Sequence, residues 1–332
     1  MDHVTFQAMV VYEEEGRFVR RIETRQVGDL PKGEVLIRVG YSSVNWKDCL
    51  SAMGNRGVSR HYPHTPGIDA AGMVAESFSE GFGKGERVLV TGYDLGMNTS
   101  GGFAEYIRVP SDWVVKLPEG LTRKEAMMLG TAGFTAGLSV KRLVDFGIPP
   151  ERGPVLVTGA TGGVGGLAIG ILKKLGYSVT AVSGRTHRPD YLKEIGADEV
   201  LSLSDMLDES GKPMGKPRWA SVVETLGGPL LTSAIKQTEP GGVVTCCGNI
   251  LSGEFSSSIY PFILRGVSLC GINSATCPMA VRQSVWKSLA TSRKPETLDT
   301  QVSILSGLDA LDEQIERMVS GERVGRSVVH LP

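Results

Sequence analysis

The pattern of hydrophobic and polar positions changes twice along the chain. Up to about residue 120, short runs rich in β-branched residues, such as 35–39 and 87–90, are separated by turns that contain glycine and proline. Many short strands with such turns are typical of a closed or partly closed barrel. We therefore expect a β-rich first domain over residues 1–123.

From residue 124 onward, apolar runs alternate with helical stretches. Thr122 and Glu125 have the spacing of a capping box and predict a helix start. Six apolar runs follow at roughly 20–25-residue intervals, which is the spacing of βα units with buried strands. The runs lie at 155–158, 178–182, 199–201, 221–224, 242–245 and 267–270. Six such strands predict a doubly wound parallel sheet over residues 124–272.

The pattern changes again in residues 273–332. Helical stretches at 279–289 and 308–320 are followed by an apolar run at 326–331 that predicts a final strand. A single strand is not stable by itself. We therefore expect this tail to return to the first domain and pair there.

Composition and charge exclude several classes of protein. The chain has 35 Lys and Arg residues against 36 Asp and Glu residues, a net charge of -1, and it has no concentrated basic surface for nucleic acid. Its five cysteines are odd in number and include no Cys-x-x-Cys pair, which favours reduced thiols. Neither a signal-peptide pattern nor a membrane-length apolar run occurs, so we expect a cytoplasmic protein without a membrane partner.

A glycine-rich turn follows the first run of the second domain. Strand 155–158 leads into this turn and then into an apolar helix, with Ala160, Gly162 and Gly165 at the three positions of a dinucleotide fingerprint. Gly162 would let the backbone approach a pyrophosphate, and Gly165 would let the helix and strand pack closely. The helix N-terminus would then bind the anion. The predicted contacts are Thr161, Gly162, Gly163, Val164 and Gly165.

The end of the next strand indicates which dinucleotide binds. An NAD site usually places an acidic residue there to accept a hydrogen bond from the ribose 2′-hydroxyl. This chain has Ser183, Gly184 and Arg185 instead. A hydroxyl and a guanidinium suit a 2′-phosphate, so the sequence favours NADPH over NADH.

The order of these domains, together with residues 85–88, 101–106 and 195–198, resembles the medium-chain dehydrogenase/reductase superfamily. The resemblance implies an α/β fold with a GroES-like β-barrel catalytic domain and a doubly wound Rossmann dinucleotide-binding domain. Zinc alcohol dehydrogenases of that superfamily have a Cys and a His where this chain has Asn45 and Ile68. Without zinc an alkoxide lacks its Lewis acid, so we expect no metal and no alcohol dehydrogenase activity.

Within the superfamily, the chain is most similar to the zinc-free, acryloyl-CoA reductase-like quinone oxidoreductases of YhdH/YhfP type. The stretches that carry this resemblance are 45–48, 66–72, 130–136, 158–165, 183–185 and 260–267. It implies NADPH-dependent reduction of an activated C=C bond, with acryloyl-CoA to propanoyl-CoA as the leading reaction. Two alternatives stay open, a quinone or enone reductase with the same residues and an NADPH-binding protein with a mainly structural or regulatory role.

The resemblance also implies which residues act in catalysis. Asn45 would donate its amide to the thioester oxygen or to the nicotinamide amide. Asp48 would order that loop or relay a proton, and Tyr93 would donate a proton. Trp46 stands where relatives carry Tyr, so a hydroxyl is lost at that position.

Further cofactor contacts and the assembly follow from the same resemblance. By position, the expected contacts are Trp46, Thr131, Thr135, Cys247, Gly248, Asn249, Phe262, Leu264, Asn273, Ser274 and Arg326. The last strand of the sheet, 267–272, would be an edge strand, and open edges invite pairing. We therefore expect a homodimer through this edge, with a small molecule, an enoyl-CoA or a quinone, as substrate.

Overall fold

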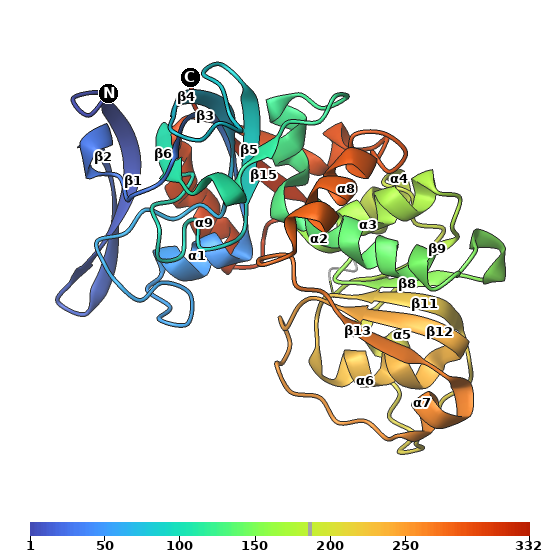
Figure 1. The fold of residues 1–332 in the computed structure, drawn as a ribbon. Helices are drawn as coiled ribbons and strands as arrows, with labels where there is room; N and C mark the ends of the chain where they lie inside the picture. Colours follow the sequence, from blue (N-terminus) through green and yellow to red (C-terminus); the bar gives the residue numbers. More distant parts are fainter. Residues whose placement is uncertain (185–187) are drawn as a thin grey trace. The chain divides into compact units, whose positions relative to one another are not determined.

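The structure, a computed structural model, describes residues 1–184 and 188–332 (Figure 1). Its internal contacts divide the chain into two compact units. The first unit comprises Met1–Thr131, Ala275–Lys287 and Val302–Pro332, and the second comprises Ala132–Ser274 and Ser288–Gln301.

The first unit is built on a seven-stranded sheet. Its strands are β3 (Val35–Val44), β4 (Asp69–Ser77), β5 (Arg87–Thr91), β6 (Tyr106–Val109), β7 (Val115–Lys116), β14 (Val302–Ser306) and β15 (Arg326–His330). The order is β14-β15-β3-β4-β5-β7, with β6 paired to β3. A separate hairpin of β1 (Thr5–Glu14) and β2 (Arg17–Gln26) completes the strands of this unit, which confirms the β-rich first domain.

Three helices accompany these strands: α1 (Trp46–Ala52), α8 (Met279–Leu289) and α9 (Leu311–Val319). Strand β15 pairs antiparallel with β3 and parallel with β14, so the final strand returns as predicted.

Residues Ser288–Gln301, in contrast, belong to the second unit. They pack on α3 (Gly163–Lys174), where Glu296 pairs with Lys174 and Pro295 lies against Gly170. The predicted return of the tail therefore does not extend to this segment.

The second unit contains a six-stranded parallel sheet. Its strands are β8 (Val155–Thr158), β9 (Val179–Val182), β10 (Glu199–Leu201), β11 (Trp219–Glu224), β12 (Thr238–Cys246) and β13 (Ser268–Gly271), in the order β10-β9-β8-β11-β12-β13. All six predicted runs are thus confirmed as strands of one sheet. Strands β8, β9 and β11 are buried along their whole length, as expected when helices cover both faces.

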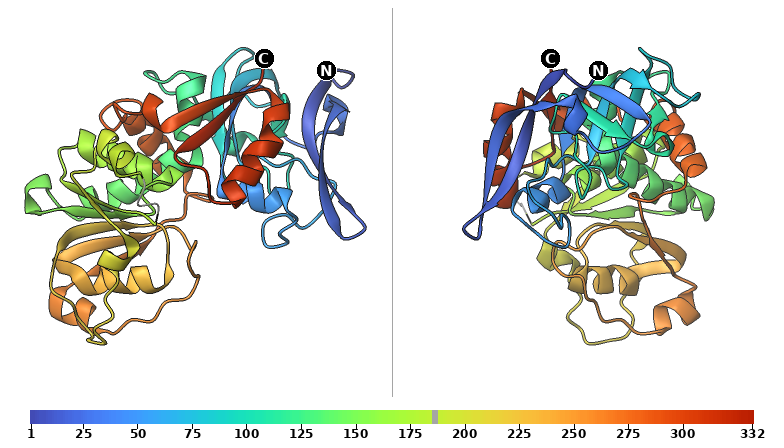
Figure 2. Two further views of the ribbon diagram at one scale, coloured as in Figure 1. Left: turned by 180° about the vertical axis from the view of Figure 1, so that it is seen from behind. Right: turned by 60° about the vertical axis from the view of Figure 1, so that its left-hand side comes forward.

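The helices of this unit lie on both sides of its sheet (Figures 1 and 2). Besides α3, they include α4 (Pro189–Glu194), α5 (Leu203–Met206), α6 (Gly228–Gln237) and α7 (Tyr260–Arg265). In the views, α3 covers one face, and α6 and α7 lie on the other. The doubly wound arrangement follows from this alternation of strands and helices.

Helix α2 (Arg123–Asp145) starts as predicted but contains an unexpected break. The Thr122 N–H donates to Glu125 Oε2 at 2.8 Å, and the Glu125 N–H donates to Thr122 Oγ1 at 3.1 Å, which confirms the capping box. Gly130 then interrupts the helix with φ 53° and ψ −157°. No helix among the described residues, α2 included, combines the length and apolar character needed to cross a bilayer.

Candidate active site

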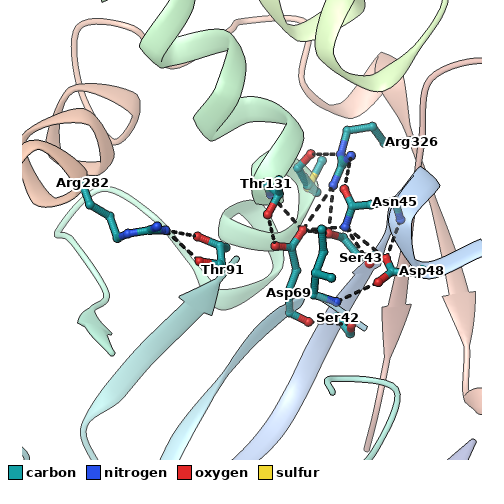
Figure 3. Close-up of polar contacts among 11 residues, drawn as sticks. Ser42, Ser43, Asn45, Asp48, Asp69, Thr91, Thr131, Arg282 and Arg326 are labelled. Atoms are coloured by element: carbon teal, nitrogen blue, oxygen red, sulfur yellow. Dashed lines mark hydrogen bonds and ion pairs between the residues drawn. The ribbon is translucent and has the colours of Figure 1, made fainter. Parts of the chain in front are cut away.

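A buried carboxylate, Asp69, is the centre of a polar cluster in the first unit (Figure 3). Its Oδ1 accepts a hydrogen bond from the Thr131 hydroxyl at 2.5 Å, and its Oδ2 accepts one from the Thr131 N–H at 2.8 Å. Oδ2 also accepts hydrogen bonds from Ser43 Oγ at 2.5 Å and Asn45 Nδ2 at 2.8 Å. The break at Gly130 brings Thr131 to this carboxylate, because it lets α2 restart at Thr131.

The cation of this cluster is Arg326, whose side chain is also buried. Its Nε donates to the Met128 carbonyl at 2.9 Å, its Nη2 to Ser43 Oγ at 2.9 Å and its Nη1 to Asn45 Oδ1 at 3.3 Å. Nη2 lies 4.0 Å from Asp69 Oδ2. Burial lowers the pKa of Arg326 to about 10, against the opposing effect of the two nearby carboxylates, so the guanidinium stays charged at neutral pH.

A second carboxylate, Asp48, holds the loop before α1. Its Oδ2 accepts hydrogen bonds from the Asn45 N–H at 2.7 Å and from Asn45 Nδ2 at 3.2 Å, and its Oδ1 accepts one from the Ile68 N–H at 2.8 Å. Burial raises the pKa of Asp48 to about 7, and the charge of Asp69 adds to this rise. These contacts match the predicted ordering of the loop by Asp48, while its proton relay stays a prediction.

The same contacts define what Asn45 does in this arrangement. Its amide nitrogen donates to both carboxylates, and its amide oxygen accepts from Arg326. Donation to a substrate oxygen, as predicted, would require one of these bonds to be exchanged. The neighbouring Trp46, the first residue of α1, is 40% exposed, so an accessible indole lies beside a buried polar cluster.

Tyr93 lies just beyond β5, in the left-handed region with φ 52°. Its ring stacks on Trp113 at a centroid distance of 5.4 Å, and the Arg282 guanidinium lies 4.4 Å from its centroid. Arg282 in turn donates to the carbonyl and hydroxyl oxygens of Thr91, the residue paired with Asp69 across β4 and β5 (Figure 3). Tyr93 is therefore positioned by ring contacts and follows a strand that borders the cluster.

The second unit contains the glycine-rich turn that was predicted to bind phosphates. Gly159 has φ +60°, and a Cβ on Gly165 would lie 2.5 Å from the Gly159 oxygen. This confirms the close approach of helix and strand predicted for Gly165. Helix α3 begins at Gly163, after the N-cap Gly162, and the first N–H groups of a helix have no partner within it. Binding of a pyrophosphate there stays a prediction.

Two hydroxyls connect this turn to the next strand. Thr161 Oγ1 lies 3.1 Å from Ser183 Oγ. Ser183, which was predicted to contact the 2′-phosphate, is therefore held by a residue of the glycine-rich turn. Gly184 follows Ser183, with its α-carbon facing Leu203. Arg185 lies outside the described residues.

A pocket of about 530 Å³ lies at the carboxyl ends of β12 and β13, where open α/β sheets bind ligands. It is lined by Cys246, Cys247, Gly248, Asn249, Gly271, Ile272 and Asn273, and Ser274 follows directly. Four predicted cofactor contacts, Cys247, Gly248, Asn249 and Asn273, therefore meet at this pocket. Thr135, another predicted contact, is buried on α2 and is not among the lining residues.

Phe262 and Leu264 do not join this pocket. Both lie on α7, whose Arg265 donates to the Thr238 carbonyl at the start of β12, the opposite end of that strand. Phe262 packs on the core beneath the sheet, and Leu264 is 62% exposed. Phe262 and Leu264 therefore lie apart from the predicted cofactor contacts that line the pocket in the same chain.

The sequence interpretation missed Ser43, Arg282 and the central position of Asp69. The sequence offered one signal, because Asp69 ends the run 67–69 that matches the zinc-ligand region of alcohol dehydrogenases. Around Asp69 the structure places amide, hydroxyl and guanidinium groups that donate hydrogen bonds to its carboxylate or pair with its charge. Within residues 1–184 and 188–332, no group of three or more His, Cys, Asp or Glu side chains is placed to hold a metal ion.

Comparisons with known proteins identify the class. Residues 31–119 match the alcohol dehydrogenase GroES-like domain, and residues 163–291 match the zinc-binding dehydrogenase domain. With the doubly wound sheet and its glycine-rich turn, these matches define a medium-chain dehydrogenase/reductase, an oxidoreductase that binds a nicotinamide dinucleotide.

Three similar proteins indicate which family within this superfamily the chain belongs to. YhfP of Bacillus subtilis, provisionally named a quinone oxidoreductase, is 44% identical over 95% of this chain and 97% of its own. Its structure with NAD bound superposes with a TM-score of 0.96 and covers 99% of this chain and 100% of that one. The acrylyl-CoA reductase AcuI of Ruegeria pomeroyi is 40% identical over 98% of both chains. The YhdH oxidoreductase of Salmonella enterica, solved with NADP, is 38% identical, with a TM-score of 0.95 over 98% of this chain and 100% of that one. The chain belongs to this YhdH/YhfP-type family.

Proposed function

We propose that this protein uses NADPH to reduce an activated C=C bond, and that acryloyl-CoA, converted to propanoyl-CoA, is its substrate. The observation that carries the proposal is the cluster around Asp69, which fills the region of the zinc ligands with hydrogen-bond donors. Alcohol oxidation needs a Lewis acid, whereas alkene reduction needs a polarised carbonyl and a proton. The similarity to AcuI over nearly the whole chain supports the same reaction.

The residues of the first unit would hold the acceptor in place and protonate it. When bound, the reduced nicotinamide supplies a hydride to the β-carbon, and the alkene electrons move onto the thioester oxygen as an enolate. The cluster of Asp48, Asp69 and Arg326 orders the loop before Trp46, whose exposed indole would contact the acceptor. Tyr93, held between neighbours, would give its phenolic proton to the α-carbon.

The preference for NADPH rests on the end of β9. Ser183 is held by Thr161, and neither Ser183 nor Gly184 supplies the carboxylate that would bind the ribose 2′-hydroxyl of NAD. Related structures contain NADP in YhdH and NAD in YhfP, so both dinucleotides must be compared. Titration of protein fluorescence with NADPH and NADH is expected to give a clearly lower Kd for NADPH. Equal Kd values would contradict this preference.

The reaction is tested by NADPH consumption with acryloyl-CoA and with 1,4-benzoquinone in one assay. The proposal predicts a kcat/KM for acryloyl-CoA within the ordinary enzymatic range of roughly 10⁴ to 10⁸ M⁻¹s⁻¹, with propanoyl-CoA as product. Activity on the quinone alone would support the function for which YhfP is named. If neither acceptor is reduced while NADPH binds tightly, a structural or regulatory role would replace both enzymatic hypotheses.

A further inference from the structure

Two adjacent cysteines, Cys246 and Cys247, line the pocket at the carboxyl end of β12. Both are partly exposed, and both contact Glu224, the last residue of β11. Cys246 Sγ lies 3.9 Å from Glu224 Oε2, and the Cys247 thiol donates to the Glu224 carbonyl oxygen at 3.4 Å. One residue therefore presents an oxygen acceptor to each of the two thiols.

The Glu224 carboxylate is fixed in this position. It is fully buried, and its Oε1 accepts hydrogen bonds from the N–H groups of Leu226 at 2.8 Å and Gly227 at 2.9 Å. Thr158 Oγ1 donates to the same oxygen at 3.1 Å, and the Gly227 N–H also reaches Oε2 at 3.0 Å. These donors favour the ionised form, although burial raises the pKa of Glu224. The carboxylate cannot turn away from Cys246 without losing these bonds.

A thiol in this pocket would be at risk from the proposed substrates. Acryloyl thioesters and quinones are electrophiles that add thiolates, and only the thiolate is a good nucleophile. In such an addition the sulfur pair forms a C–S bond to the β-carbon, and the alkene pair moves to the α-carbon, which takes a proton from water. The thiol proton goes to solvent, so no group leaves and no oxidant is needed.

We propose that Glu224 protects Cys246 and Cys247 from alkylation by holding both as thiols, since its oxygens face each sulfur and oppose a thiolate there. The biological reason for this protection depends on the proposed function, but the effect on the thiols does not. Burial and then the Glu224 charge raise the pKa of both thiols, that of Cys247 to about 12. Besides Glu224, the titratable group that acts on Cys247 is Cys246, which raises its pKa further, while the Ser139 hydroxyl of α2 acts in the opposite direction. On Cys246, a hydrogen bond with the Gly248 backbone opposes the effect of Glu224.

The test measures alkylation by N-ethylmaleimide at each cysteine, read by peptide mass spectrometry at pH 7.5. Glu224→Gln is expected to raise the rate at Cys246 about 10-fold, because removal of the charge increases the fraction of reactive thiolate. Cys270 on β13 serves as the internal control, because a general loosening of the sheet would raise its rate as well. Thr158→Val is the matched variant, since it disturbs the same turn without removing the charge, and it should leave the Cys246 rate within about 2-fold of wild type.

An unchanged Cys246 rate in Glu224→Gln, or an equal rise at Cys270, would overturn the proposal. If Glu224→Gln does not fold, Glu224→Asp is used instead, because its shorter side chain withdraws the carboxylate from Cys246 Sγ and keeps the charge. The rate at Cys246 should then rise relative to the rate at Cys270, and an unchanged ratio would refute the protection. Repeating the alkylation with acryloyl-CoA separates the two proposals, because adduct formation at Cys246 needs no turnover.

Discussion

At the scale of single residues, two buried carboxylates share one buried cation. Asp48 and Asp69 are both fully buried, and Arg326 lies close enough to Asp69 to pair with it. Asp69 receives four hydrogen bonds. Asp48 receives three, two from Asn45 in its own loop and one from the N–H of Ile68. Burial, and then the nearby charge of Asp69, raise the pKa of Asp48 to about 7.

This raised pKa predicts a pH-dependent stability. The native protein holds the Asp48 proton up to about pH 7, whereas the unfolded chain releases it near pH 4. Between these values the unfolded state binds fewer protons, so the contribution of Asp48 falls as the pH rises. The free energy of unfolding of the wild type, minus that of Asp48→Asn, should decline by at most about 1.4 kcal/mol per pH unit over this window. Above about pH 7 the difference should be flat.

Urea denaturation of both proteins between pH 4.5 and 8 measures this difference. Asp205→Asn is a suitable control, because hydrogen bonds from Ser202 lower the pKa of Asp205, which therefore completes its titration below this range. A constant difference between wild type and Asp48→Asn across the window would show that Asp48 is ionised in the native state.

Gly130 carries the second residue-scale prediction. Its φ of +53° is strained for any other residue, and a Cβ there would lie 2.5 Å from Arg326 Nη2 and Ser43 Oγ and 2.6 Å from Asp69 Oδ2. Gly147 also has a positive φ, +70°, but a Cβ there would have nothing within 4 Å. We expect Gly147→Ala to cost about 1–2 kcal/mol of unfolding free energy, and Gly130→Ala to cost roughly 1–3 kcal/mol more. Equal losses in urea denaturation would mean that the cluster can open to admit a methyl group.

At the scale of elements, the sequence predicted those features that depend on neighbouring residues. The capping box of Thr122 and Glu125 and the six strands of the second unit are local patterns, and the structure confirms them. The break at Gly130 could not be predicted, because it is stabilised by Asp69 on a strand far away in the sequence. For the same reason Asn45 was predicted as a catalytic donor and Arg326 as a cofactor contact, while their hydrogen bond to each other emerged only from the fold.

The packing of α3 on β8 yields an element-scale prediction. In Gly165→Ala the new Cβ would lie 2.5 Å from the oxygen and 2.8 Å from the carbon of Gly159, and these backbone atoms cannot move aside as a side chain can. The N-terminus of α3 would shift away from the turn, so we expect the Kd for NADPH to rise at least about 10-fold. Gly176→Ala, at the turn after the same helix, has φ +83° and open space, so it should lower stability without changing this Kd. An unchanged Kd in Gly165→Ala would argue against cofactor binding at this turn.

At the scale of the whole molecule, the six-stranded sheet ends in an exposed edge. Among the described residues β13 pairs with β12 alone. Apolar side chains are exposed in the preceding segment, at Ile250, Leu251, Phe255, Ile259, Ile263 and Leu264, with exposures of 44–63%. Exposed strand edges and apolar surface of this kind are usually covered by a partner. A second copy of the chain would cover both if its β13 paired antiparallel with this one around a two-fold axis.

The predicted homodimer is tested with substitutions beside this edge. In the double variant Ile259→Lys with Ile263→Lys, two side chains that are 63% and 62% exposed in one chain become charged. Neither packs in the core, so the fold should survive, but burying the charges between two copies would be costly. By sedimentation at micromolar concentration, the wild type should have twice the 35.5 kDa chain mass, and the double variant should have the mass of one chain. The control is Phe146→Lys, at a 49% exposed site after α2 and away from the β13 edge, and it should stay dimeric. Loss of the dimer in this variant would mean that a charge at any exposed apolar position has the same effect. A wild-type protein of single-chain mass would instead mean that the β13 edge stays open to water, protected only by the shortness of the strand.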